Sequence, residues 1–66
     1  MTNIENLKER TNFAKEQIKQ ILKDTGLCFY GINKQTNEIY IADRQDVVMG
    51  EAQFAIGITI EQVNNL

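Results

Sequence analysis

A chain of 66 residues forms one domain, and a domain of this size buries only about 60% of the surface that its unfolded chain exposes. The composition, 42% hydrophobic and 24% charged with a net charge of −2, is ordinary for a folded globular protein and excludes a basic nucleic-acid arm or an acidic tail. The single cysteine excludes an internal disulfide, and the absence of histidine removes the commonest zinc ligand and general base. Because so small a core rarely suffices alone, self-association is the expected supplement.

The chain carries no recognisable targeting or membrane signal. Residues 1–10 are polar and lack the apolar segment of a signal peptide, and no apolar run approaches the ~20 residues of a membrane span. We therefore expect a cytoplasmic protein without membrane association. The richness in Asn, Gln, Lys and Ile is typical of an AT-rich genome, such as that of a bacterium or its phage.

Residues 2–25 are predicted to form an amphipathic helix. Thr2 and Glu5 have the spacing of a capping box at its start, and Gly26 suits the left-handed residue that ends a helix. One apolar stripe roughly 100° wide follows the helix. Its members are Ile4, Leu7, Thr11, Ala14, Ile18, Ile21 and Leu22. We expect this stripe to pack on the sheet.

Two further features of this helix bear on binding. The stripe from residue 4 to residue 21 also has the 4-3 spacing of coiled-coil core positions, but Thr11 and Ala14 are poor knobs, so packing on a sheet is favoured over a coiled-coil dimer. Phe13 points away from the stripe, either as a singly exposed aromatic or as an anchor for a partner. The lysines on one flank are balanced by glutamates, which favours a solvated face over a phosphate-binding one.

Residues 27–42 are predicted to form a β-hairpin with two apolar faces. The turn over 33–38 is expected to close with Asn37 in the left-handed conformation. In that register Ile32 lies opposite Tyr40, and Tyr30 lies opposite Ala42, whereas a loop that differs by one residue would exchange the facing sets. One face would comprise Leu27, Phe29, Gly31, Ile39 and Ile41, and should meet the helix stripe. The other would comprise Cys28, Tyr30, Ile32, Tyr40 and Ala42.

The remaining chain is predicted to complete the sheet. Residues 43–46 resemble a turn, and residues 47–49 are expected to form a short strand or an inward loop. Residues 53–58 alternate as a third strand that pairs antiparallel with a hairpin strand. Thr59 and Gln62 form a second capping-box pattern, which predicts a short helix over 60–66.

An alternative interpretation is a single helix over 51–66, which Gly57 and its β-branched neighbours disfavour. The sequence therefore predicts one α+β domain over 1–66. In it, the N-terminal amphipathic helix packs on a small antiparallel sheet of about three strands (α-β-β-β), with a short C-terminal helix.

The side chains form no recognisable catalytic or metal-binding pattern. Cys28 falls in mid-strand with no histidine to activate it, and such a cysteine is usually a small hydrophobe. Asp43, Asp46 and Glu51 are close in sequence, but they lack the spacing and glycine of a calcium loop and are better explained as turn residues. We therefore expect no catalysis, no metal and no cofactor.

The expected site is the second hairpin face together with the exposed aromatic of the helix. Its residues are Cys28, Tyr30, Ile32, Tyr40 and Phe13. The predicted function is a non-catalytic interaction or regulatory module that acts by surface contact, as a homodimer or with a protein partner. By class-level analogy, such a protein could come from a phage or mobile element and inhibit a host protein.

The alternative function is single-stranded nucleic-acid binding, in which Tyr30 and Tyr40 stack bases on the sheet. The small number of Lys and Arg residues around these tyrosines disfavours that hypothesis, because phosphate contacts supply much of nucleic-acid affinity.

Overall fold

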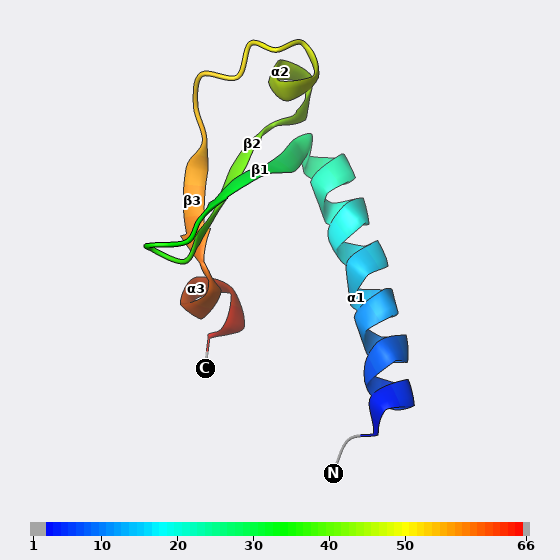
Figure 1. Ribbon diagram of the computed structural model, residues 1–66. Coiled ribbons are helices and arrows are strands. Elements are labelled where there is room, and N and C mark those ends of the chain that lie inside the picture. The colour runs from blue at the N-terminus through cyan, green and yellow to red at the C-terminus, as the bar shows by residue number, and fades with distance from the viewer. Residues whose placement is uncertain (1–2, 66) are drawn as a thin grey trace.

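The computed structural model describes residues 3–65 and has an α+β fold (Figure 1). The elements in chain order are α1 (Ile4–Thr25), β1 (Leu27–Asn33), β2 (Glu38–Asp43), α2 (Arg44–Val48), β3 (Ile56–Thr59) and α3 (Ile60–Asn64). The three strands form one antiparallel sheet in the order β1-β2-β3. The predicted class, the three-stranded sheet and the short closing helix are confirmed.

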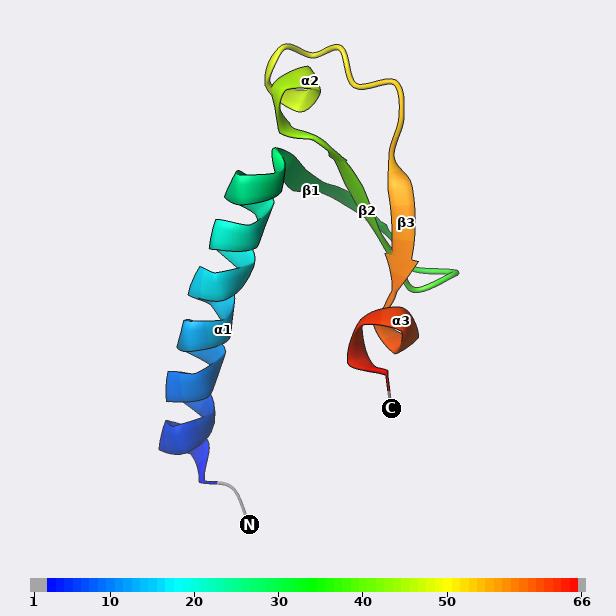
Figure 2. The ribbon, with the colours of Figure 1, turned by 180° about the vertical axis from the view of Figure 1, so that it is seen from behind.

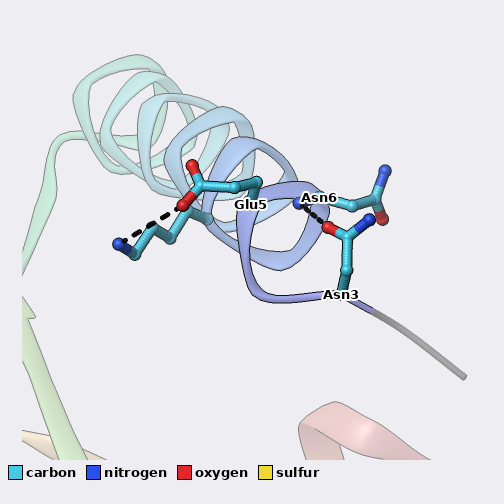
Figure 3. A network of polar contacts seen from close by, with 4 residues as sticks. Asn3, Glu5 and Asn6 are labelled. Atoms are coloured by element: carbon cyan, nitrogen blue, oxygen red, sulfur yellow. Dashed lines mark hydrogen bonds and ion pairs between the residues drawn. The ribbon is translucent and has the colours of Figure 1, made fainter.

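The start of α1 is fixed by an asparagine cap. The Asn3 side-chain oxygen accepts a hydrogen bond of 2.8 Å from the backbone N–H of Asn6 (Figure 3). The cap is thus Asn3, one residue after the predicted Thr2, which lies outside the described residues. The negative charge of Glu5 in the first turn interacts favourably with the helix dipole, and Glu5 forms an exposed ion pair of 3.9 Å with Lys8.

The end of α1 confirms the predicted glycine stop. Gly26 has a φ of +71°, and its N–H donates to the carbonyls of Leu22 and Lys23. Its own carbonyl accepts a hydrogen bond of 2.9 Å from the backbone N–H of Arg44, whose side chain also donates to the Leu27 carbonyl at 3.2 Å. The end of the helix is therefore tied to the start of α2 across the sheet.

The hairpin turn forms as predicted, but the register differs. Asn37 takes the expected left-handed conformation, with a φ of +57°. Ile32 lies opposite Ile39, however, and not opposite Tyr40. Next to the turn, the pairing is thus that of the alternative loop, which differs by one residue. A β-bulge in β1 then leaves Tyr30 without a partner in the ladder and shifts the pairing of Leu27–Phe29 by one further position.

The bulge redistributes the side chains between the two faces of the sheet. Ala42 is paired with Cys28 rather than with the predicted Tyr30. Since directly opposed residues share a face, the pairing defines one face, here termed the aliphatic face, with Asp43 at its edge and seven large apolar residues: Leu27, Phe29, Ile32, Ile39, Ile41, Ile56 and Ile58. The opposite side, here termed the tyrosine face, comprises Cys28, Gly31, Tyr40, Ala42 and Gly57, with Asn33, Glu38 and Thr59 at the end nearer the hairpin turn.

The segment after the hairpin is helical over Arg44–Val48, so the expected short strand or inward loop over 47–49 is wrong. Asp43 caps α2, and its side chain accepts a hydrogen bond of 3.0 Å from the Asp46 backbone N–H. A capping aspartate satisfies one of the free N–H groups of the first turn and so favours a helical turn over an extended chain. The predicted turn over 43–46 is absorbed into this cap and helix.

The C-terminal part confirms the strand and the second capping box. β3 begins at Ile56, later than predicted, because residues 51–55 are irregular. Thr59 accepts from the Gln62 N–H at 3.1 Å, and the Gln62 side chain accepts from the Thr59 N–H at 2.8 Å. The alternative of one helix over 51–66 is wrong, and Leu66 lies outside the described residues.

The chain buries little of its apolar surface. Within residues 3–65, Ala42 is the one buried hydrophobic side chain, at 3% exposure. The radius of gyration is 14.3 Å, against about 11 Å for a compact domain of this length. α1 meets the sheet beside β1 and leans away from it toward its N-terminal end (Figures 1 and 2). The predicted burial of the helix stripe against the sheet is therefore not met within a single chain, because every residue of α1 keeps part of its surface in solvent.

Candidate interaction surface

The aliphatic face is assembled by matching pairs on all three strands. Phe29 on β1 lies opposite Ile41 on β2, which in turn lies opposite Ile56 on β3. Ile39 is likewise placed between Ile32 and Ile58. Because side chains alternate along each strand, the large aliphatic residues of three separate segments form one continuous surface.

A groove runs between this face and the C-terminal half of α1. Its floor comes from the sheet, one wall from α1 and one end from α3. The lining residues are Ile18, Ile21, Leu22, Phe29, Ile39, Ile41, Ile58, Thr59, Ile60, Val63 and Asn64. A second hollow, lined in part by Leu27, Phe54 and Ile56, shares Ile41 and Ile58 with the groove. The apolar surface therefore continues from α3 along the sheet to the segment before β3.

Large side chains on this surface are open to solvent. The exposed fraction is 51% for Phe29, 60% for Ile21 and 74% for Ile56. Complete burial of one such side chain contributes roughly 1.5–3 kcal/mol relative to its exposed state. Contiguous exposed apolar surface of this kind is typical of interaction sites and ligand-binding grooves.

The N-terminal half of α1 carries apolar side chains that have no cover from the sheet. Ile4 and Leu7 are 61% and 47% exposed. They line a shallow hollow whose other residues, Lys8 and Lys15 among them, all belong to α1. The stripe predicted from the sequence is therefore present, but its first half projects beyond the sheet of its own chain (Figure 2).

The tyrosine face is partly covered by its own side chains. Tyr40 crosses from β2 to cover β3, since a Cβ built on Gly57 would lie only 3.2 Å from a carbon of its ring. The Tyr40 hydroxyl accepts a hydrogen bond of 3.4 Å from the Asn33 side chain. Beside it, Ala42 is buried and Cys28 is half-buried. Small residues and one aromatic ring therefore cover this side over β2 and β3, whereas Gly31 on β1 is exposed.

The structure separates the residues of the predicted site. Cys28 and Tyr40 share the tyrosine face, whereas the bulge places Ile32 on the aliphatic face. Tyr30 occupies the bulge itself and is 53% exposed. Phe13, at 68% exposure, belongs to the side of α1 away from its stripe. These five residues therefore form no single surface.

The groove residues were missed as a site because their alternation marks them as core. Ile39, Ile41 and Ile58 are typical of a strand face that a helix covers. The sequence does hold one signal of their availability, the coiled-coil spacing of the helix stripe, which allows a second helix to compete for the same surface.

Polar and metal-binding chemistry contributes little to this surface. Within residues 3–65, no three His, Cys, Asp or Glu side chains gather as metal ligands would. The helices of that part of the chain are too short or too polar to cross a membrane. Asp43, one of the candidate cation ligands, uses its side chain to cap α2.

No protein-family model, curated protein or solved structure matches this chain.

Proposed function

We propose that the protein is a small non-catalytic interaction module that acts by surface contact and exists as a homodimer. The observation that carries this proposal is the open aliphatic groove, whose floor and walls are large apolar side chains on three strands and two helices. A groove of this kind favours an apolar occupant. Contact between water and its apolar side chains is unfavourable, and a polar ligand would lose its hydration there.

The area of exposed surface favours a second copy as the occupant. The chain exposes 6008 Å², whereas a compact protein of 7.6 kDa exposes about 4,300 Å². The difference, about 1,700 Å², exceeds the ~800 Å² that each partner contributes to an interface of standard size. Interfaces of obligate homodimers are larger and resemble a domain core cut in half, which fits a chain that buries almost no core alone.

The lining of the groove supports contact rather than catalysis. Thr59 and Asn64 are the polar residues among those that line it, and none of its lining side chains is titratable. General acid–base or nucleophilic catalysis needs such groups within reach of a substrate. Aliphatic walls with a few polar groups at one end are instead suited to another protein surface.

Sedimentation equilibrium at micromolar concentration tests the proposal. We expect the wild type to have twice the chain mass of 7.6 kDa. Ile56→Glu, which places a charge on the aliphatic face at a residue already 74% exposed, should dissociate the dimer. Gln53→Glu in the neighbouring irregular segment is the matched control and should remain dimeric. If the wild type and Ile56→Glu are both folded monomers, the proposed homodimer is wrong.

A further inference from the structure

The spacing of the apolar positions along α1 is symmetric about the centre of the stripe. The stripe positions follow one another at intervals of 3, 4, 3, 4 and 3 residues. They are Ile4, Leu7, Thr11, Ala14, Ile18 and Ile21. When two such helices lie antiparallel, the first position meets the last, the second meets the fifth, and the two central positions meet each other. Each large aliphatic then contacts a large aliphatic, and the small residues face one another at the centre.

The two halves of α1 differ in their relation to the sheet. Ile18 and Ile21 in the C-terminal half form a wall of the groove. Ile4 and Leu7 in the N-terminal half do not line it, and that half of α1 leans away from the sheet (Figure 2). One half of the helix therefore provides part of a binding site, and the other half presents an apolar edge of the kind that the site would accept.

This division selects the antiparallel orientation. In an antiparallel pair, Ile4 and Leu7 of one copy lie beside Ile21 and Ile18 of the other, which places them at the groove of that other copy. In a parallel pair, the two N-terminal halves would meet far from either sheet, and both grooves would stay open. Only the first arrangement covers the aliphatic face and the helix stripe together.

The dimensions agree with this arrangement. A helix of 22 residues is about 33 Å long, so half of it spans about 16 Å. Strands of four to seven residues span roughly 13–23 Å, which is the length of sheet available to receive it. The small side chains of Thr11 and Ala14 at the centre allow the close approach that helix pairs reach at about 8–10 Å between axes.

We infer that two copies of the chain associate through an antiparallel pair of α1 helices, in which the N-terminal half of each α1 lies in the groove of the other copy. This inference rests on the proposed homodimer and specifies its geometry. The interface is isologous, as a two-fold dimer requires, because the same stripe and the same groove are used twice.

Cysteine cross-linking tests the orientation. Thr11→Cys and Ala14→Cys are made separately on a Cys28→Ala background, mixed in equal amounts through a denaturing step, refolded and oxidised. Random pairing of equal amounts would give the mixed 11–14 disulfide twice as often as either the 11–11 or the 14–14 product, and the antiparallel register predicts a mixed product well above that ratio. Phe13→Cys on the same background is the control, and it should form little cross-linked product because it lies on the opposite side of α1.

The cross-linking products separate failure of the inference from failure of the proposed function. A dimer that yields mainly 11–11 and 14–14 disulfides has parallel helices, which overturns the inference and leaves the homodimer intact. A dimer with no disulfide at either position pairs through another surface and also overturns it. A monomer in sedimentation removes both proposals.

The wild-type chain provides a second measurement that does not depend on the cysteine variants folding. In a dimer mixed from isotope-labelled and unlabelled chains, we expect intermolecular nuclear Overhauser effects between the Ile4 methyl groups and the side chains of Ile21 and Phe29. If the intermolecular contacts of Ile4 are confined to Ile4 itself, the antiparallel pair is wrong.

A charge-substitution pair gives the energetic counterpart. Ile4 and Phe13 are both largely exposed in one copy, at 61% and 68%. Ile4→Glu should weaken the dimer at least tenfold, since it places a carboxylate in the partner's apolar groove, whereas Phe13→Glu should change the dissociation constant less than threefold. A larger effect at residue 13 than at residue 4 would overturn the inference.

Discussion

The two faces of the sheet differ in how far side chains of the same chain cover them. On the tyrosine face, the Tyr40 ring covers Gly57, and Ala42 is buried between its neighbours. On the aliphatic face, Phe29 and Ile56 are more than half exposed. They belong to the same three strands as the residues of the tyrosine face. On the first face, a side chain of the same chain covers part of the sheet, whereas the second face remains an open groove.

The difference follows from the sizes of the side chains. Small residues need little cover, so one aromatic ring covers the β3 part of the tyrosine face. The aliphatic face presents seven large side chains, and the α1 of the same chain reaches only one edge of them. A chain of this length can thus encode more apolar surface than it can cover, and the proposed second copy would complete the core.

Truncation at the centre of the aliphatic face should have the largest effect. Ile41 lines both the groove and the hollow beside it. We expect Ile41→Ala to lower the free energy of unfolding by about 2–4 kcal/mol at fixed protein concentration, the usual cost for an isoleucine in a packed core. Urea unfolding followed by circular dichroism measures this loss.

Val48→Ala is the matched control for that truncation. Val48 is 80% exposed at the end of α2, so its removal should change the free energy of unfolding by less than about 0.5 kcal/mol. Equal losses in the two variants would mean that the aliphatic face stays open in solution.

A pair of glycine substitutions examines the tyrosine face. A Cβ on Gly57 would collide with the Glu38 carboxylate, which can swing away, and would crowd the Tyr40 ring at 3.2 Å, so Gly57→Ala should cost about 1 kcal/mol. Gly31 lies on the same face with nothing within 4 Å of its added Cβ. Gly31→Ala should therefore be neutral or stabilise by up to about 0.5 kcal/mol. Thermal unfolding of the two variants should differ in this order, and the reverse order would contradict the packing of Tyr40 over β3.

The smallest expected effect is at the bulge. Tyr30 is half exposed and has no ladder partner, so Tyr30→Ala should change the free energy of unfolding by less than about 1 kcal/mol and leave the dimer intact. The same variant examines the nucleic-acid hypothesis. We expect no binding of single-stranded oligonucleotides by wild type or variant at low salt. Salt-sensitive binding that Tyr30→Ala weakens would instead favour that alternative.

Local signals in the sequence predicted most of the elements. Gly26 ended α1, Asn37 closed the hairpin, and the Thr59–Gln62 box began α3, because each of these depends on contacts within a few residues. The N-cap was misplaced by one residue, since Thr2 and Asn3 are both good caps and only geometry distinguishes them.

The bulge and the open groove depend on information beyond local sequence. A bulge at Tyr30 leaves no composition signal, yet it moves Ile32 from one face to the other and thereby changes the predicted site. The helix stripe and the sheet face are each recognisable as core surfaces. Whether they bury against each other in one chain or across two is decided by the path of the chain after Gly26, which periodicity does not encode.

The most direct test of the completed aliphatic face is the dependence of thermal stability on protein concentration. If two copies share one core, folding and association are coupled, and the unfolding midpoint rises steadily as the chain concentration is increased over several decades. We predict this rise for the wild type and for Phe13→Glu. A midpoint that stays constant over the same range would contradict the account, because it would mean that the single chain is stable with its groove open.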